Sequence, residues 1–281
     1  MIDISLAVVD VFGPSVPKDI WQFVTVRDMT NDQNLNGHNS PVTSIASQLA
    51  QVRQRVAQAA VAVGREPSSV RLLAVSKTFG ADAVIEAVKA GQMAFGENYI
   101  QEGVEKIQAL RQWLAEPAQA GQAVLEWHCI GPIQSNKTRL VAENFDWVQS
   151  VDRLKIAQRL SEQRPAELPP LQICLQVNMD GGANKSGVSP EDALSLAQTV
   201  SRLPRLVLRG LMAIPEPASD DASARAVHAR TADLLAQLNE AGGLPQPLDT
   251  LSMGMSADLA PAIAAGSTMV RVGSAIFGGR G

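Results

Sequence analysis

The sequence predicts a (β/α)8 barrel, and three observations lead to this fold class. The chain has 281 residues, 46% of them hydrophobic, which is enough to bury one large core. From residue 42 onward, eight short apolar segments of the strand type alternate with segments of helical periodicity. The loop after the first strand, residues 76–80, lacks the GxGxxG pattern of a dinucleotide-binding sheet, which disfavours an open doubly wound fold.

The first units follow from apolar periodicity. Ile45, Leu49, Val52 and Val56 fall near helical spacing, so residues 43–63 are expected to form an amphipathic helix on the core. The next apolar segment, 72–75, has no helical gaps, as expected for a parallel strand that is covered on both faces. The alternation continues with a helix at 81–90, a strand at 93–96, a helix at 100–115, a strand at 124–130, and a loop at 131–137 that opens a helix.

The remaining units complete the predicted barrel. Ser189, Pro190 and Glu191 stand in the order of N-cap, first helical residue and first-turn acid, and Gly266 closes the last long helix. Strands are predicted at 147–150, 171–177, 206–214, 250–252 and 268–272, and helices at 152–163, 189–201, 221–241 and 257–265.

Residues 1–41 are predicted to be an extension outside a single barrel domain at 42–281. The apolar segment 4–12 is too short to span a bilayer and lacks the basic flank of a signal peptide. Residues 31–41 are polar and rich in turn formers. Two interpretations stay open: a disordered extension, or a start site assigned upstream of the true one at Met29.

Composition excludes several classes of function. A net charge of −4 gives no broad basic field, so nucleic acid and anionic membranes are not expected as partners. The two cysteines, Cys129 and Cys174, lie in apolar segments without CxxC spacing, which favours buried reduced thiols. The three histidines show no metal-ligand pattern. We therefore expect a cytoplasmic protein without a metal site.

Lys77 is the first candidate functional residue, because it follows the buried strand 72–75. A lysine whose stem is desolvated at the end of such a strand has a lowered pKa, as imine chemistry with an aldehyde requires. The alternative is that Lys77 is only the first solvated residue after the strand. The remaining loops decide between these interpretations, since barrels gather reactive side chains at the carboxyl ends of their strands.

The loops after the seventh and eighth strands fit an anion site. Ser256 lies at a predicted helix start, and Gly273 with Ser274 follows the last strand, where barrels characteristically bind phosphate. Each residue also has a simpler explanation, Ser256 as an N-cap and Gly273 as a turn residue. Both loops lie where barrel phosphate loops belong, in the same chain as a strand-end lysine, which favours the functional interpretation of these residues.

Seven spaced motifs resemble those of the YggS/PROSC pyridoxal phosphate homeostasis proteins, and together they cover residues 42–281 in order. Residues 1–41 depart from the short start that is usual in that family. The motifs are VSKT at 75–78, FGENYIQE at 95–102, WHCIGPIQSNK at 127–137, KSG at 185–187, RGLM at 209–212, SMGMSAD at 252–258 and GSTMVRVG at 266–273.

The resemblance implies a fold-type III barrel similar to the amino-terminal domain of alanine racemase. Such a barrel carries pyridoxal 5′-phosphate (PLP) as a Schiff base, here on Lys77. Carried over by position, Ser256, Gly273 and Ser274 would bind the phosphate, with help from the backbone at Met255.

Two further residues take roles from the resemblance. Asn98 would lie beside the cofactor ring, and Arg271 would face the pyridine nitrogen. A guanidinium is permanently protonated and donates a hydrogen bond, so it keeps the ring uncharged and makes it a weaker electron sink. Lys137 would either lie near the mouth of the site and assist cofactor transfer, or be a solvated first-turn lysine.

Three functions follow for comparison. The first is a non-catalytic PLP protein that stores or delivers the cofactor, with PLP-dependent apoenzymes as recipients, and it is expected to be a monomer. The second is a weak amino-acid racemase that uses Lys77 alone, because the single tyrosine, Tyr99, belongs to the loop after the second strand and no additional domain supplies another base. The third is an aldolase that forms a Schiff base with a phosphorylated sugar.

Overall fold

The computed structural model describes residues 44–119, 124–181 and 186–279. These residues belong to a compact unit, Thr43–Gly281. The predicted extension at 1–41 and Lys185 of the KSG motif lie outside the described residues.

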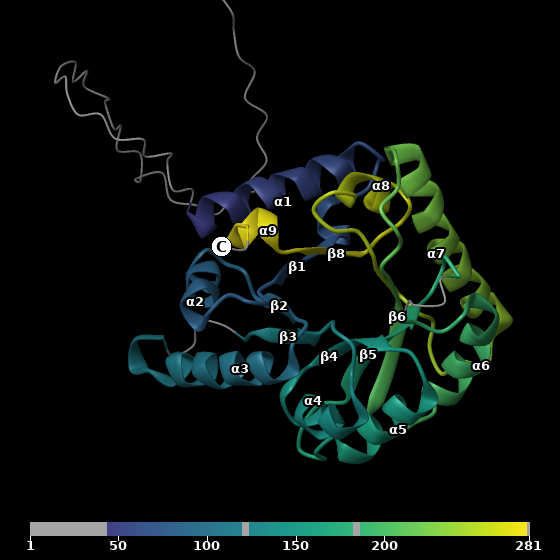
Figure 1. The fold of residues 1–281 in the computed structure, drawn as a ribbon, viewed down its shortest axis with the longest axis horizontal. Helices are drawn as coiled ribbons and strands as arrows, with labels where there is room; N and C mark the ends of the chain where they lie inside the picture. Colours follow the sequence, from purple (N-terminus) through teal and green to yellow (C-terminus); the bar gives the residue numbers. More distant parts are fainter. Residues whose placement is uncertain (1–43, 120–123, 182–185, 280–281) are drawn as a thin grey trace, which may run out of the picture. The chain divides into compact units, whose positions relative to one another are not determined.

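The predicted (β/α)8 barrel is confirmed. Eight parallel strands pair in chain order among the described residues, and the pairing of β1 with β8 closes the sheet (Figure 1). The strands are β1 (Arg71–Val75), β2 (Ala94–Glu97), β3 (Glu126–Cys129), β4 (Trp147–Val151), β5 (Leu171–Val177), β6 (Leu206–Ala213), β7 (Thr250–Ser252) and β8 (Met269–Val272).

Helices surround this sheet, and side-chain caps fix several of their starts (Figure 1). Ser44, Ser189 and Asp220 each accept a hydrogen bond from a backbone N–H in the first turn of the helix that follows. The α-helices are α1 (Ile45–Val61), α2 (Ala81–Lys89), α3 (Ile100–Ala115), α4 (Thr138–Asn144), α5 (Leu154–Gln163), α6 (Pro190–Val200), α7 (Asp221–Ala241), α8 (Leu259–Ala264) and α9 (Ser274–Phe277). The described part of the chain also contains the single-turn 3-10 helices η1 (Pro67–Ser69), η2 (Pro117–Gln119) and η3 (Ser135–Lys137).

Most predicted boundaries agree with the structure to within one or two residues, and two differences have a physical cause. The third strand begins at Glu126 rather than at residue 124, because Val124 is 93% exposed and precedes the first paired residue of β3. Helix α9 was not predicted, since four residues are too few to show a helical period.

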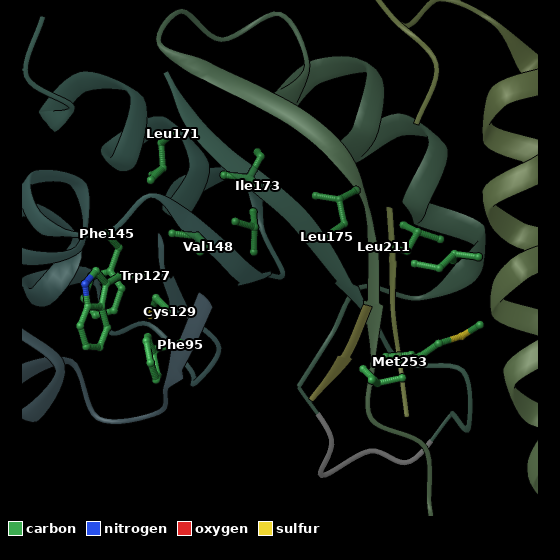
Figure 2. Close-up of a cluster of buried hydrophobic side chains, with 14 of the residues drawn as sticks. Phe95, Trp127, Cys129, Phe145, Val148, Leu171, Ile173, Leu175, Leu211 and Met253 are labelled. Carbon is green, nitrogen blue, oxygen red and sulfur yellow. The ribbon is translucent and has the colours of Figure 1, made fainter. Parts of the chain in front are cut away.

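The main hydrophobic core lies between the strands and the helices. Figure 2 shows side chains of this layer from β2, β4, β5 and β6, such as Phe95, Val148, Ile173 and Leu211, all fully buried. Each Å2 of apolar surface removed from water contributes about 25 cal/mol, so this layer is the principal source of stability.

The strands approach one another closely at Gly210 on β6. A Cβ atom at this position would lie 1.8 Å from the carbonyl oxygen of Thr250 on β7, so only glycine fits. Both cysteines, Cys129 and Cys174, are buried and free, as predicted, and burial raises the pKa of each thiol to about 12. Among the described residues, no helix has the length and apolar character needed to span a membrane.

Candidate functional site

A cavity of about 360 Å3 opens at the carboxyl ends of the barrel strands. It lies where the loops after β1, β2, β7 and β8 meet, so the convergence expected of strands one, seven and eight is present. The cavity brings together all seven residues that the sequence singled out: Lys77, Asn98, Met255, Ser256, Arg271, Gly273 and Ser274.

Lys77 reaches the cavity because of its register on β1. Val75, the last residue of the strand, lines the cavity, and side chains alternate in direction along a strand, so Lys77 lies on the same side two residues later. Ser76 between them is fully buried and points the other way, toward Glu97 and α3. Lys77 itself is half-buried, and Thr78 follows it in the left-handed conformation, with φ of 70°.

Arg271 provides a buried cation at the floor of the cavity. Only 4% exposed, it donates from Nη1 to the carbonyl oxygen and to Oγ of Ser252 at 2.6 and 2.8 Å, and from Nη2 to the carbonyl oxygen of Ala213 at 2.9 Å. Burial lowers its pKa to about 10, although the charge of Asp258 acts in the opposite direction. The guanidinium therefore stays protonated at neutral pH and is fixed by acceptors on β6 and β7.

A chain of hydrogen bonds runs from Arg271 through the interior of the barrel. Ser252 donates from Oγ to Gln149 Oε1 at 2.6 Å, and Gln149 Nε2 lies 2.9 Å from His128 Nδ1. His128 Nε2 in turn lies 2.6 Å from Glu126 Oε1 at the amino end of β3. Ser252, Gln149 and His128 are fully buried, so the cavity floor is connected to the opposite end of the barrel by satisfied polar groups.

The charges in this interior chain follow from the contacts. Burial lowers the pKa of His128, which is neutral at physiological pH and accepts from Gln149 at Nδ1 while it donates at Nε2. Burial raises the pKa of Glu126, but its contacts with His128 and with Arg71, 2.7 Å away, outweigh this and lower it to about 2. The chain thus links a cation at the cavity to a carboxylate at the far end.

The loop after β7 is held in place by Asp258. Its Oδ1 accepts from the backbone N–H of Met255 at 2.6 Å, and its Oδ2 lies 2.8 Å from Nε2 of the buried His228 on α7. Arg55 of α1 donates to the carbonyl oxygen of Ser256 at 3.0 Å. These contacts fix the backbone N–H and hydroxyl groups that the loop presents to the cavity.

The loop after β8 comes close to β1 at Gly273. A Cβ atom there would lie 3.1 Å from the carbonyl oxygen of Val75, a tight contact beside the cavity. Ser274 follows as the first residue of α9 and is exposed to the cavity. The two serine-bearing loops therefore offer hydroxyl and backbone donors on the same rim as Lys77.

The cavity fits PLP chemically. Asn98 Oδ1 is buried and has no hydrogen-bond partner among the described residues, which leaves it available to a ligand. An amine suits the aldehyde of PLP, the guanidinium of Arg271 can donate to a ring nitrogen, and the serines can donate to a phosphate. PLP would supply the aldehyde carbon for a reversible bond to a lysine.

Comparison with known proteins agrees with this geometry. The family model described as alanine racemase, N-terminal domain, matches residues 47–281. A pyridoxal phosphate homeostasis protein of Pseudomonas aeruginosa is 56% identical over 239 residues, which cover 85% of this chain and 97% of that protein. The Escherichia coli K12 protein of the same description is 52% identical over 239 residues, covering 85% and 98%. This chain belongs to the pyridoxal phosphate homeostasis protein family.

Solved structures agree with the family assignment. PipY of Synechococcus elongatus, solved with PLP bound, superposes with a TM-score of 0.70 at 36% identity, covering 84% of this chain and 100% of that one. Alanine racemase from Corynebacterium glutamicum gives a TM-score of 0.59 at 16% identity, covering 84% and 62%, which shows a common barrel fold alone.

The sequence did not predict all the residues that line the cavity of this family member. Thr78, Phe79, Ile130 and Ile214 also line the cavity, and their strand-end positions were the available signal. Lys137 lies half-buried in η3 and is not among the described residues that line the cavity.

Proposed function

We propose that this protein binds PLP in the barrel cavity as a Schiff base on Lys77 and serves intracellular PLP homeostasis. The observation that carries the proposal is the meeting of Lys77, Arg271 and two serine-bearing loops around one cavity. The membership in the pyridoxal phosphate homeostasis family and the PLP-bound relative PipY support the choice of ligand.

In this proposal, different residues bind different parts of PLP. The amine of Lys77 condenses with the aldehyde, so that a C=N bond replaces the C=O bond and one water leaves. Ser256, Gly273, Ser274 and the backbone at Met255 bind the phosphate. Asn98 lies beside the ring, and Arg271 donates to the pyridine nitrogen, which keeps the ring uncharged.

A storage or delivery role is favoured over racemisation. Among the described residues that line the cavity, Lys77 and Arg271 are the titratable side chains, and Arg271 holds its proton at neutral pH. Tyr99 is 55% exposed and does not line the cavity in this part of the chain. Racemisation by two bases needs a second group that exchanges a proton on the opposite face of a substrate.

The test is covalent trapping. Purified apoprotein mixed with PLP should turn yellow, lose the colour on borohydride reduction, and carry a pyridoxyl adduct on the Lys77 peptide by mass spectrometry. Lys77→Ala should abolish the adduct, and the matched control Lys137→Ala should retain it. An adduct on another lysine, or a protein that stays colourless, would refute the proposal.

The same preparation tests activity and delivery. A carrier should yield no D-alanine from L-alanine, and D-alanine formation that disappears with Lys77→Ala would instead identify a racemase. We further propose that the protein is a cytoplasmic monomer that passes PLP to apoenzymes. Sedimentation at several concentrations tests the monomer, and recovery of activity by a PLP-dependent apoenzyme mixed with the loaded protein tests the transfer.

A further inference from the structure

A buried ion cluster lies behind the turn that carries Lys77. The Nζ atom of Lys106 on α3 is 2.7 Å from each of three acceptors: the carbonyl oxygen of Ser76, Glu97 Oε1 and Glu102 Oε1. Lys106 is 5% exposed, Glu97 and Ser76 are fully buried, and the Glu102 side chain is 32% exposed. We refer to Ser76, Glu97, Glu102 and Lys106 as the Lys106 cluster.

The Lys106 cluster binds the main chain on both sides of Lys77. On one side, the carbonyl oxygen of Ser76 accepts a hydrogen bond from Lys106 Nζ, and Ser76 Oγ donates to Glu97 Oε1 at 2.6 Å. On the other side, the backbone N–H of Thr78 donates to Glu102 Oε1 at 2.6 Å. The residues immediately before and after Lys77 are thereby tied to α3 and β2.

The turn needs such support because Thr78 is strained. A β-branched residue with φ of 70° lies in the left-handed region, which is unfavourable for such a side chain and persists only where the surroundings enforce it. The hydrogen bond from the Thr78 N–H to Glu102 is one contact that holds this conformation. The backbone immediately after Lys77 therefore depends on contacts with α3 for its direction.

Stability alone does not explain the cluster. Burial raises the pKa of Glu97, and the charge and hydrogen bond of Lys106 act against this. Buried ion pairs are often no more stabilising than an apolar side chain of equal size, and position 106 lies beside Ile107 and Leu110 on the buried face of α3. A methionine would fill the same space, but it could not bind the carbonyl oxygen of Ser76.

We propose that Lys106, Glu97 and Glu102 are positioning residues that aim the amine of Lys77 into the cavity. The inference rests on the proposed function, in which Lys77 forms the bond to PLP. The cluster acts through the backbone of Ser76 and Thr78, and it does not touch the ligand.

The experiment compares Glu102→Ala with the matched control Glu105→Ala. Glu105 is an exposed residue about one helical turn after Glu102 on α3. The rate at which borohydride traps PLP on the Lys77 peptide should fall about tenfold in Glu102→Ala and stay at the wild-type value in the control, because a misdirected nucleophile loses reactivity steeply. Glu102→Gln keeps an acceptor for the Thr78 N–H and should recover most of the rate. Lys106→Met should match or exceed the loss in Glu102→Ala.

A second readout needs no PLP. In the apoprotein, reductive methylation with formaldehyde and cyanoborohydride should label Lys77 several-fold more slowly in Glu102→Ala, measured against Lys89 and Lys155 of the same molecule. Wild-type rates for both readouts in folded Glu102→Ala would overturn the inference and leave the proposed function intact. If wild-type protein traps no PLP on Lys77, the proposed function fails, and the methylation rates still decide the inference. Should Lys106→Met not fold, the Glu102 pair decides alone.

Discussion

Gln149 is the centre of the hydrogen-bond chain inside the barrel, and its replacement by leucine tests that chain. Gln149→Leu keeps a side chain of similar size but removes the acceptor for Ser252 Oγ and the donor to His128 Nδ1. Both partners are fully buried, so neither finds water in compensation. Each buried group without a partner costs about 1 to 3 kcal/mol, so the two together predict a loss of about 2 to 6 kcal/mol in the free energy of unfolding.

The measurement is urea unfolding followed by circular dichroism, with exposed Gln108→Leu on α3 as the matched control. A double-mutant cycle with Ser252→Ala adds a second criterion. Ser252→Ala already removes one partner of Gln149. The loss of unfolding free energy in the double mutant should therefore be smaller than the sum of the two single-mutant losses, by about 1 kcal/mol or more. A Gln149→Leu protein within about 0.5 kcal/mol of wild type, or strict additivity, would refute the description of the chain.

Three other predictions follow from single residues. Ser274→Ala should speed the dissociation of PLP, measured by transfer to an excess of an acceptor apoenzyme, and leave the unfolding midpoint unchanged; unaltered retention would place the phosphate elsewhere. Gly210→Ala should destabilise the fold by at least about 3 kcal/mol in denaturant unfolding, because its Cβ would overlap a carbonyl oxygen of β7, and a mild effect would contradict the close approach. Glu126 has a lowered folded-state pKa of about 2, so its contribution is present above pH 4.5 and is lost as the pH falls through 2. That loss is about 1 to 2 kcal/mol after allowance for the 30% of its side chain in water, and Glu126→Gln should lack it in an acid titration of stability.

The barrel could be predicted because its determinants are local. Each strand is a short apolar segment and each long helix shows its own period, so counting eight alternations was sufficient. Some of the cavity residues could be predicted for a related reason, since a closed parallel barrel places every strand end on one rim, whereas Asn98, Met255 and Arg271 came from the family resemblance. Lys77, Ser256 and Ser274 needed only their positions relative to strand ends.

The interior contacts could not be predicted, because they depend on which strands face each other across the barrel. Gln149 is 21 residues from His128 and 103 from Ser252, and no sequence period relates these distances. Lys106 did leave a signal: it is a charged residue on a helix face otherwise occupied by Val104, Ile107 and Leu110. A lysine in that setting needs acceptors, and Glu97 and Glu102 were nearby in the same motif.

The polarity of the interior chain has a consequence for the imidazole of His128. Arginine can only donate, so the Ser252 hydroxyl accepts from Arg271 and donates its own hydrogen to the side-chain oxygen of Gln149. The side-chain nitrogen of Gln149 then donates to Nδ1 of His128, and the ring carries its hydrogen on Nε2. The tautomer of His128 is thus the one that both ends of the chain require, a guanidinium that can only donate and a carboxylate that can only accept. Reversing the direction of any one of these hydrogen bonds would require reversing all of them.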